Sequence, residues 1–175
     1  MAEAVATIDL RTLDLPAGGA VELTPRVPPI ELRLGGQDYR VEPDAPQVDL
    51  RVVRSLSGLH LDLRADVVLV GPCWRCLEEA RIPLHVRSSE FQEDGRAGGD
   101  DFDDDLDSAY VDADEVLDVA QWSRDAVAES VPATVLCRDD CPGLPTRYGE
   151  RDEGEAVDPR WDALREVSER LRGEG

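Results

Sequence analysis

Apolar and polar residues alternate along much of the N-terminal half of the chain, most clearly in residues 48–52 and 59–67. Such alternation is typical of a strand with one buried face, and the intervening Ser55-Leu56-Ser57-Gly58 predicts a hairpin turn. Shorter alternating runs predict further strands of the same sheet at residues 5–10, 21–23, 30–34 and 39–41. We therefore expect residues 4–91 to be mostly antiparallel β-structure.

The second strand of this predicted hairpin runs on into Cys73-Trp74-Arg75-Cys76. An aliphatic run that starts at Ile82 then continues to Phe91 as another strand. Pro83 suits the edge or the start of a strand, because proline has no N–H group to donate. The first cysteine pair is therefore expected on a turn between two strands.

Two later segments have the periodicity of amphipathic helices. Asp112 is the expected N-cap of the first helix, which we place at residues 113–131. Asp158 caps the second helix and Pro159 takes its first helical position, which gives a range of 158–172.

These elements predict an α+β fold, with an antiparallel, partly closed, barrel-like sheet in the N-terminal half and two packed helices in the C-terminal half. Residues 1–148 are expected to form a single domain, and residues 149–175 a linker followed by the C-terminal amphipathic helix. The tail helix can pack on its own domain or dock on a partner, and packing is favoured because Trp161 makes a large buried anchor.

The segment between sheet and helix is strongly acidic, with eight Asp and Glu residues between positions 93 and 107. Self-repulsion and few apolar groups predict a flexible acidic loop at 93–110. A calcium loop is disfavoured, because Leu106 stands where such a loop needs glycine and Asp112 stands where it needs glutamate.

The net charge of −20 comes from 39 acidic and 19 basic residues, all of the basic ones arginine. Such a field repels nucleic acid and attracts basic proteins, which argues against a broad nucleic-acid-binding surface. No apolar run reaches the length of a membrane span, and no secretory signal is visible. These features predict a cytoplasmic protein that does not bind a membrane.

The four cysteines form two close pairs, Cys73 with Cys76 and Cys137 with Cys141. Two such pairs can supply a tetrahedral thiolate site for zinc. Redox chemistry is a second interpretation, although it favours a Cys-x-x-Cys at a helix start, which this pattern does not predict. The third interpretation is that the cysteines are buried as small hydrophobic residues.

No catalytic site is predicted. The two histidines, His60 and His85, lie at polar-facing positions of alternating strands. No phosphate-binding loop, nucleophile elbow or metalloprotease helix appears in the sequence. We therefore expect neither an enzymatic activity nor a small-molecule substrate.

Three motifs resemble, in order, those of the YceD family, the large ribosomal RNA subunit accumulation proteins. The first is Cys73-Trp74-Arg75-Cys76-Leu77-Glu78, and the second is the segment from Cys137 to Leu144. The third is Asp158-Pro159-Arg160-Trp161-Asp162-Ala163-Leu164. The resemblance covers about residues 45–172, and the ordered set is specific although each motif alone is weak.

The chain departs from the family pattern after its second motif. Many members continue with another close cysteine pair, but Pro145 and Tyr148 stand at those positions in this chain. A metal ion would therefore have to be bound across two regions by Cys73, Cys76, Cys137 and Cys141. Zinc binding and loss of the metal remain alternatives of equal weight.

The resemblance implies a non-enzymatic factor that supports the synthesis, processing or accumulation of large-subunit (23S) ribosomal RNA. Its expected partners are a large-subunit ribosomal precursor, ribosomal RNA or a basic ribosomal protein. Candidate partner-binding residues are Arg75, Arg138, Arg160 and Trp161. The alternatives are a cytoplasmic thiol-redox or metal-dependent protein that uses the cysteine pairs, and an acidic module that sequesters a basic protein.

Overall fold

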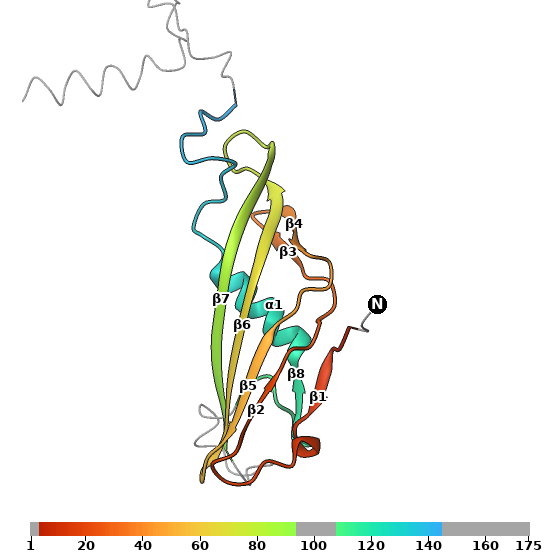
Figure 1. The fold of residues 1–175 in the computed structure, drawn as a ribbon. Helices are drawn as coiled ribbons and strands as arrows, with labels where there is room; N and C mark the ends of the chain where they lie inside the picture. The colour runs from red at the N-terminus through yellow and green to blue at the C-terminus, as the bar shows by residue number, and fades with distance from the viewer. Residues whose placement is uncertain (1–3, 94–107, 145–175) are drawn as a thin grey trace, which may run out of the picture. The chain divides into compact units, whose positions relative to one another are not determined.

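The structure is a computed structural model that describes residues 4–93 and 108–144. The chain divides into two compact units, Met1–Gly143 and Leu144–Gly175, and the first unit contains every helix and strand of the described ranges. The short strands of the N-terminal part are β1 (Thr7–Asp9), β2 (Ala20–Leu23), β3 (Glu31–Leu34), β4 (Gln37–Glu42) and β5 (Asp49–Arg54), with the 3-10 helix η1 (Leu10–Leu13) after β1. Two long strands and two shorter elements follow (Figure 1), namely β6 (Gly58–Pro72), β7 (Glu79–Glu93), β8 (Val116–Asp118) and helix α1 (Val119–Ser130).

Strand β6 organises the main sheet. It pairs with β7 in antiparallel register along its whole length, from Gly58 opposite Glu93 to Pro72 opposite Glu79. The other edge of β6 is shared by two strands, β5 near the start of β6 and β4 near its end. Because β2 pairs with β5 and β3 pairs with β4, the six-stranded sheet forks along β6.

The expected antiparallel sheet is present, but its barrel-like closure is not. Within the part of the chain that the structure describes, β7 pairs only with β6, and neither β2 nor β3 reaches it. The sheet is therefore open. The physical reason is the length of β6. Its second edge pairs with β5 along one part and with β4 along another, so the sheet branches instead of closing into a barrel.

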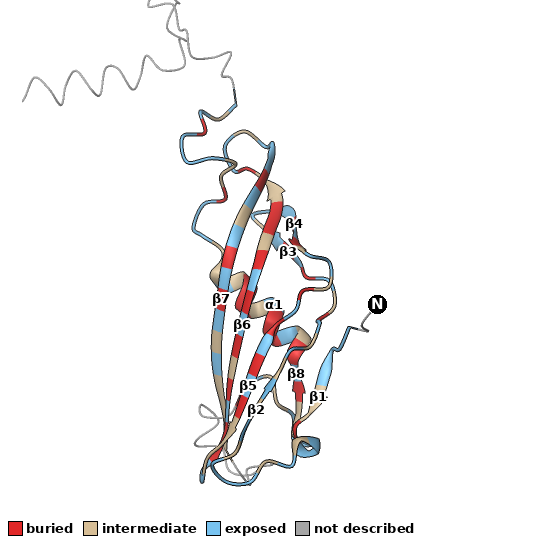
Figure 2. Ribbon diagram, viewed as in Figure 1, coloured by how far each residue is buried: buried red, intermediate tan, exposed pale blue. Residues whose placement is uncertain are grey.

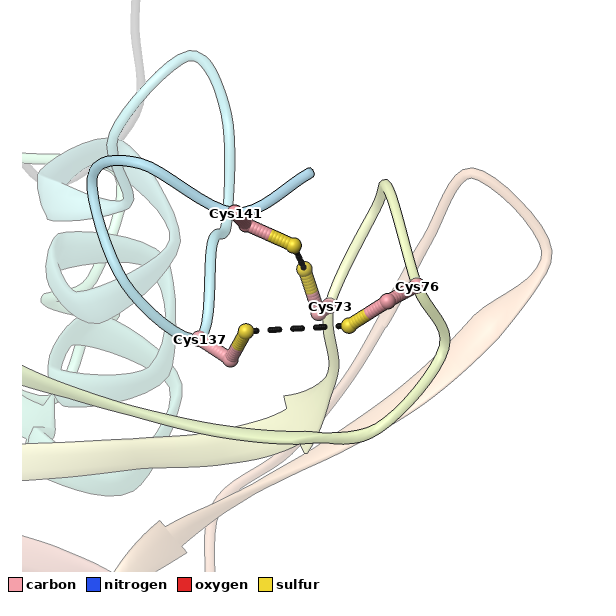
Figure 3. Close-up of side chains that lie close together, drawn as sticks. All are labelled: Cys73, Cys76, Cys137 and Cys141. Carbon is pink, nitrogen blue, oxygen red and sulfur yellow. Dashed lines mark hydrogen bonds between the residues drawn. The ribbon is translucent and has the colours of Figure 1, made fainter. Parts of the chain in front are cut away.

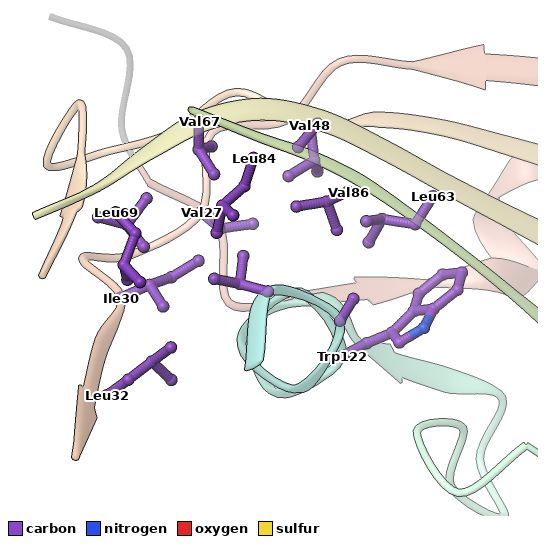
Figure 4. Packing of buried hydrophobic residues seen from close by; sticks show 14 of the residues in the cluster. Val27, Ile30, Leu32, Val48, Leu63, Val67, Leu69, Leu84, Val86 and Trp122 are labelled. Atoms are coloured by element: carbon purple, nitrogen blue, oxygen red, sulfur yellow. The ribbon is translucent and has the colours of Figure 1, made fainter. Parts of the chain in front are cut away.

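Helix α1 covers one face of the sheet and completes the core. Burial alternates along β6 and β7 (Figure 2), as expected for strands with one face turned to a core. Figure 4 shows aliphatic side chains of the sheet and its adjoining loops gathered around α1, with Trp122 beside Leu63 and Val86. Trp122 is fully buried, and its Nε1 donates a hydrogen bond to Ser88 Oγ on β7 at 2.9 Å.

The start of α1 differs from the sequence prediction, which placed it at residue 113. Asp112 caps a turn instead of the helix, because its carboxylate accepts hydrogen bonds from the backbone N–H groups of Asp114 and Val116. The chain then forms β8, which pairs with β1. The true N-cap is Asp118, whose carboxylate accepts from Gln121 N at 2.8 Å. Pairing with β1 and burial of Leu117 override the local helix signal.

The other predicted elements of the C-terminal half lie outside the described residues. These are the second helix at 158–172, the linker before it and most of the acidic loop. One α-helix, α1, is present in the described ranges, where it ends just before Pro132 as expected. No helix in these ranges combines the length and the apolar character that crossing a membrane requires.

Replacement of the main helix anchor tests this packing. Trp122→Ala should lower the free energy of unfolding by about 3–5 kcal/mol, because it leaves a cavity between α1 and β7. Equilibrium urea denaturation measures the change. Glu129→Ala, at an exposed position of the same helix, should change stability by less than about 0.5 kcal/mol. Equal effects of the two substitutions would contradict the packing of Trp122 against β7.

Candidate metal centre

The four cysteines converge at one end of the β6–β7 hairpin (Figure 3). Cys73 and Cys76 lie in the turn between the two strands, whereas Cys137 and Cys141 lie in the loop that follows α1. Cys73 Sγ is 3.8 Å from Cys141 Sγ, and Cys76 Sγ is 3.6 Å from Cys137 Sγ. All four sulfurs lie within 4.8 Å of one another, and all are free thiols.

This spacing suits a tetrahedral metal ion. A zinc–sulfur bond of about 2.3 Å gives an edge of about 3.8 Å between sulfurs at the corners of a tetrahedron. The two distances that join the loops already have nearly this length. The longest separation allowed by the cluster, 4.8 Å, needs to shorten by only about 1 Å. The geometry and the soft donor set are therefore compatible with zinc.

The first cysteine turn is held by its own backbone. Cys73 N donates to Glu78 O at 2.7 Å, and Leu77 N donates to Cys73 O at 3.0 Å. Leu77 has a φ of +64°, a left-handed conformation that reverses the chain before β7 begins. The N–H of Arg75 also points to Cys73 Sγ, with a nitrogen–sulfur distance of 3.4 Å. These bonds bring both sulfurs of the pair to the same site.

Hydrogen bonds to backbone carbonyls also join the two cysteine loops. Trp74 N donates to Val135 O at 2.9 Å, and Arg75 Nη1 donates to Cys141 O at 3.0 Å. Within the second loop, Cys141 N donates to Arg138 O at 3.1 Å. The protein itself therefore positions the second pair against the first, so the site is largely preformed.

The shared site separates the pKa values of its thiols. Burial of the Cys73 sulfur acts to raise its pKa, but backbone N–H groups of Cys76, Arg75 and Cys137 outweigh burial and lower it to about 6. Burial raises the pKa of Cys137 to about 12, and hydrogen bonds with the other three sulfurs act in the same direction. Without a metal, the cluster thus favours a thiolate at Cys73 and a thiol at Cys137.

The structure locates two of the four candidate partner-binding residues. Arg75 contacts the carbonyl of Cys141, so its guanidinium joins the two loops. Arg138 forms an ion pair with Asp140, with 3.1 Å between Nε and Oδ1. Arg160 and Trp161 lie outside the described residues. A role in partner binding stays a prediction for all four.

One feature of the site was not found by sequence reasoning. Trp74 Nε1 donates to Tyr39 Oη at 2.8 Å, and Tyr39 Oη donates to the carbonyl of Pro72 at 2.8 Å. Gly71 makes room for the tyrosine ring, since a Cβ there would lie 2.3 Å from Tyr39 Cδ1. A glycine inside an otherwise aliphatic strand was the available signal, because such a glycine often marks the close approach of another group.

The thiol pKa values give a spectroscopic prediction for the reduced, metal-free protein. Thiolate ultraviolet absorbance should first rise as the pH rises through about 6, well below the ordinary value of 9.0. The step arises because the folded turn stabilises the charged form of Cys73. Cys73→Ser should remove it. A titration that begins only near the ordinary cysteine value would contradict this assignment.

Comparison with known proteins gives a family and a set of relatives. Residues 61–168 match the family described as Large ribosomal RNA subunit accumulation protein YceD. Uncharacterized proteins of Mycobacterium bovis (Mb2951c) and Mycobacterium tuberculosis (Rv2926c) are each 31% identical over 179 residues, which covers 96% of this chain and 86% of theirs. No solved structure matches. The matched range contains all four cysteines, and the chain belongs to the YceD family.

Proposed function

We propose that this chain is a non-enzymatic factor that supports the synthesis, processing or accumulation of 23S ribosomal RNA, and that its four cysteines bind one zinc ion. The observation that carries the proposal is the match to the YceD family, whose description links it to large ribosomal RNA. The cysteine cluster lies inside the matched range and has the spacing of a thiolate metal site. Zinc would hold the hairpin turn and the loop after α1 together.

The environment of the sulfurs favours a structural metal over thiol catalysis. A redox thiol needs access to its substrate, but Cys73 and Cys141 are almost completely buried. Cys73 directly follows a strand, whereas catalytic Cys-x-x-Cys pairs favour a helix N-terminus. Each sulfur also has a close neighbour on the other loop, as a single tetrahedral site requires.

The charge of the protein favours action through a basic partner. A net charge of −20 repels the phosphates of free RNA and attracts basic proteins at long range. We therefore place the protein in the cytoplasm, bound to large-subunit precursors through a basic ribosomal protein or assembly factor. Its effect on ribosomal RNA would then follow from the assembly step that it supports.

Metal content tests the first half of the proposal. The purified protein should contain one zinc ion per chain, and both Cys73→Ser and Cys141→Ser should lose most of it. Elemental analysis measures the zinc, and hydrogen exchange should show faster exchange in both loops of either variant. The control Ser57→Ala, in the β5–β6 turn, should keep full occupancy. Zinc-free wild-type protein, or loosening of one loop only, would refute the shared site.

Loss of the gene tests the second half. Deletion should lower 23S ribosomal RNA relative to 16S ribosomal RNA, and the wild-type gene should restore it. The tagged protein should co-sediment with precursors of the large subunit in sucrose gradients. The proposal would be refuted if ribosomal RNA levels stay normal after deletion and the tagged protein is absent from every precursor fraction.

A further inference from the structure

A group of exposed and half-buried apolar side chains lies at the cysteine end of the hairpin. Leu34, Trp74 and Leu77, together called the Trp74 patch, line a hollow of about 320 Å³ with Cys73 and the β3–β4 turn. Trp74 is 46% exposed and Leu77 is 57% exposed, and the two line the same hollow instead of lying singly on the surface. We propose that the Trp74 patch is a docking surface for a basic protein segment, with an arginine or lysine side chain lying against the Trp74 indole.

The indole is held in place before any partner arrives. Its Nε1 is hydrogen-bonded to Tyr39 Oη, which is itself bonded to Pro72 O. Tyr39 is buried, with 2% exposure. The edge of the ring is therefore anchored while much of its surface remains open. Because this side chain has little freedom left to lose, a ligand that covers it loses little ordering entropy.

The chemistry of the hollow suits a long cationic side chain. A guanidinium or ammonium group is attracted to the face of an indole, and its aliphatic stem can lie along apolar groups. Leu34 and Leu77 supply such groups beside Trp74. The hollow thus offers separate contacts for the charged head and for the stem of one arginine or lysine.

Local charge also favours a cation. Four thiolates around one zinc ion leave about two negative charges uncompensated beneath the patch. Glu78 and Asp139 are exposed in the two cysteine loops. Arg138 is paired with Asp140, whereas Arg75 donates to the neutral Cys141 carbonyl and keeps its positive charge, which only partly offsets these acidic groups. This surface therefore attracts basic side chains.

The same arrangement disfavours RNA. Unpaired bases do stack on exposed aromatic rings, but binding also needs cations that follow the phosphates. Arg33, on β3 near the hollow, and Arg138 each lie beside an aspartate, Asp38 and Asp140, so these cations are matched by carboxylates that repel phosphates. A basic protein can therefore contact both the Trp74 ring and the acidic groups around it, whereas a nucleic acid strand is repelled by those acidic groups. This inference rests on the proposed function, because the zinc charge and the ribosomal setting come from it.

Binding to defined ribosomal components tests the surface. Zinc-loaded, full-length protein is immobilised and exposed separately to proteins stripped from purified large ribosomal subunits and to purified 23S ribosomal RNA. Retained proteins are identified and quantified by mass spectrometry. Wild-type protein should retain one or a few basic large-subunit proteins, and added salt should weaken their binding.

Three variants distinguish the patch from general charge. Leu77→Asn removes apolar surface but tolerates the positive φ at this position, and Trp74→Ser removes the ring. Each should weaken retention about tenfold with zinc content unchanged. Leu56→Asn is the control, because Leu56 is 94% exposed in the β5–β6 turn, at the other end of β6. If Trp74→Ser loses zinc, Leu77→Asn alone decides the result.

Several outcomes would overturn the docking surface. These are equal retention by all variants, retention of no protein by the wild type, and Trp74-dependent retention of RNA. The deletion strain separates this failure from failure of the proposed function. If Leu77→Asn and Trp74→Ser restore 23S ribosomal RNA as well as the wild type does, the patch is refuted while the ribosomal role stands. If deletion has no effect, the ribosomal role itself fails.

Discussion

The antiparallel ladder between β6 and β7 supports both the core and the candidate site. Each strand has 15 residues, and their pairing is continuous from Gly58 opposite Glu93 to Pro72 opposite Glu79. One face of this hairpin receives α1, and the free edge of β6 receives β5 and β4. The turn at its end presents Cys73 and Cys76. The branched sheet and the positions of Cys73 and Cys76 therefore both depend on this ladder.

Short-range patterns in the sequence predicted the strands and turns that are formed by residues close together in the chain. The hairpin around Gly58 and the turn that holds Cys73 and Cys76 follow from alternation and from turn residues, and the structure has both. The predicted start of α1 was wrong, because Asp112 and Glu115 form a sequence pattern that is also found at helix N-termini. Pairing of β8 with β1, which is distant in sequence, decides that segment. The open sheet was likewise hidden, since no local pattern tells which strands share an edge.

In the candidate site, too, some features were predictable from the sequence and others depend on contacts between distant residues. Pro145 and Tyr148, at the positions of the family's further cysteine pair, predicted that any metal ion must be bound by both pairs, and the four sulfurs do lie together. The support around them was not predictable from spacing. The contact of Tyr39 with Trp74 joins residues 35 positions apart, and Arg75 reaches a carbonyl 66 positions away. Such contacts depend on how the strands and the loop after α1 meet, which a single sequence does not state.

The length of the hairpin also limits what a single molecule could contact at one time. At about 3.4 Å per residue, the ladder separates its two ends by at most ~48 Å. One end carries the cysteine turn, and at the other end the chain leaves Glu93 for its most acidic segment. A compact domain of about 100 residues has a radius of gyration of about 13 Å and is therefore narrower than this span. One such domain cannot contact both ends of the hairpin at the same time.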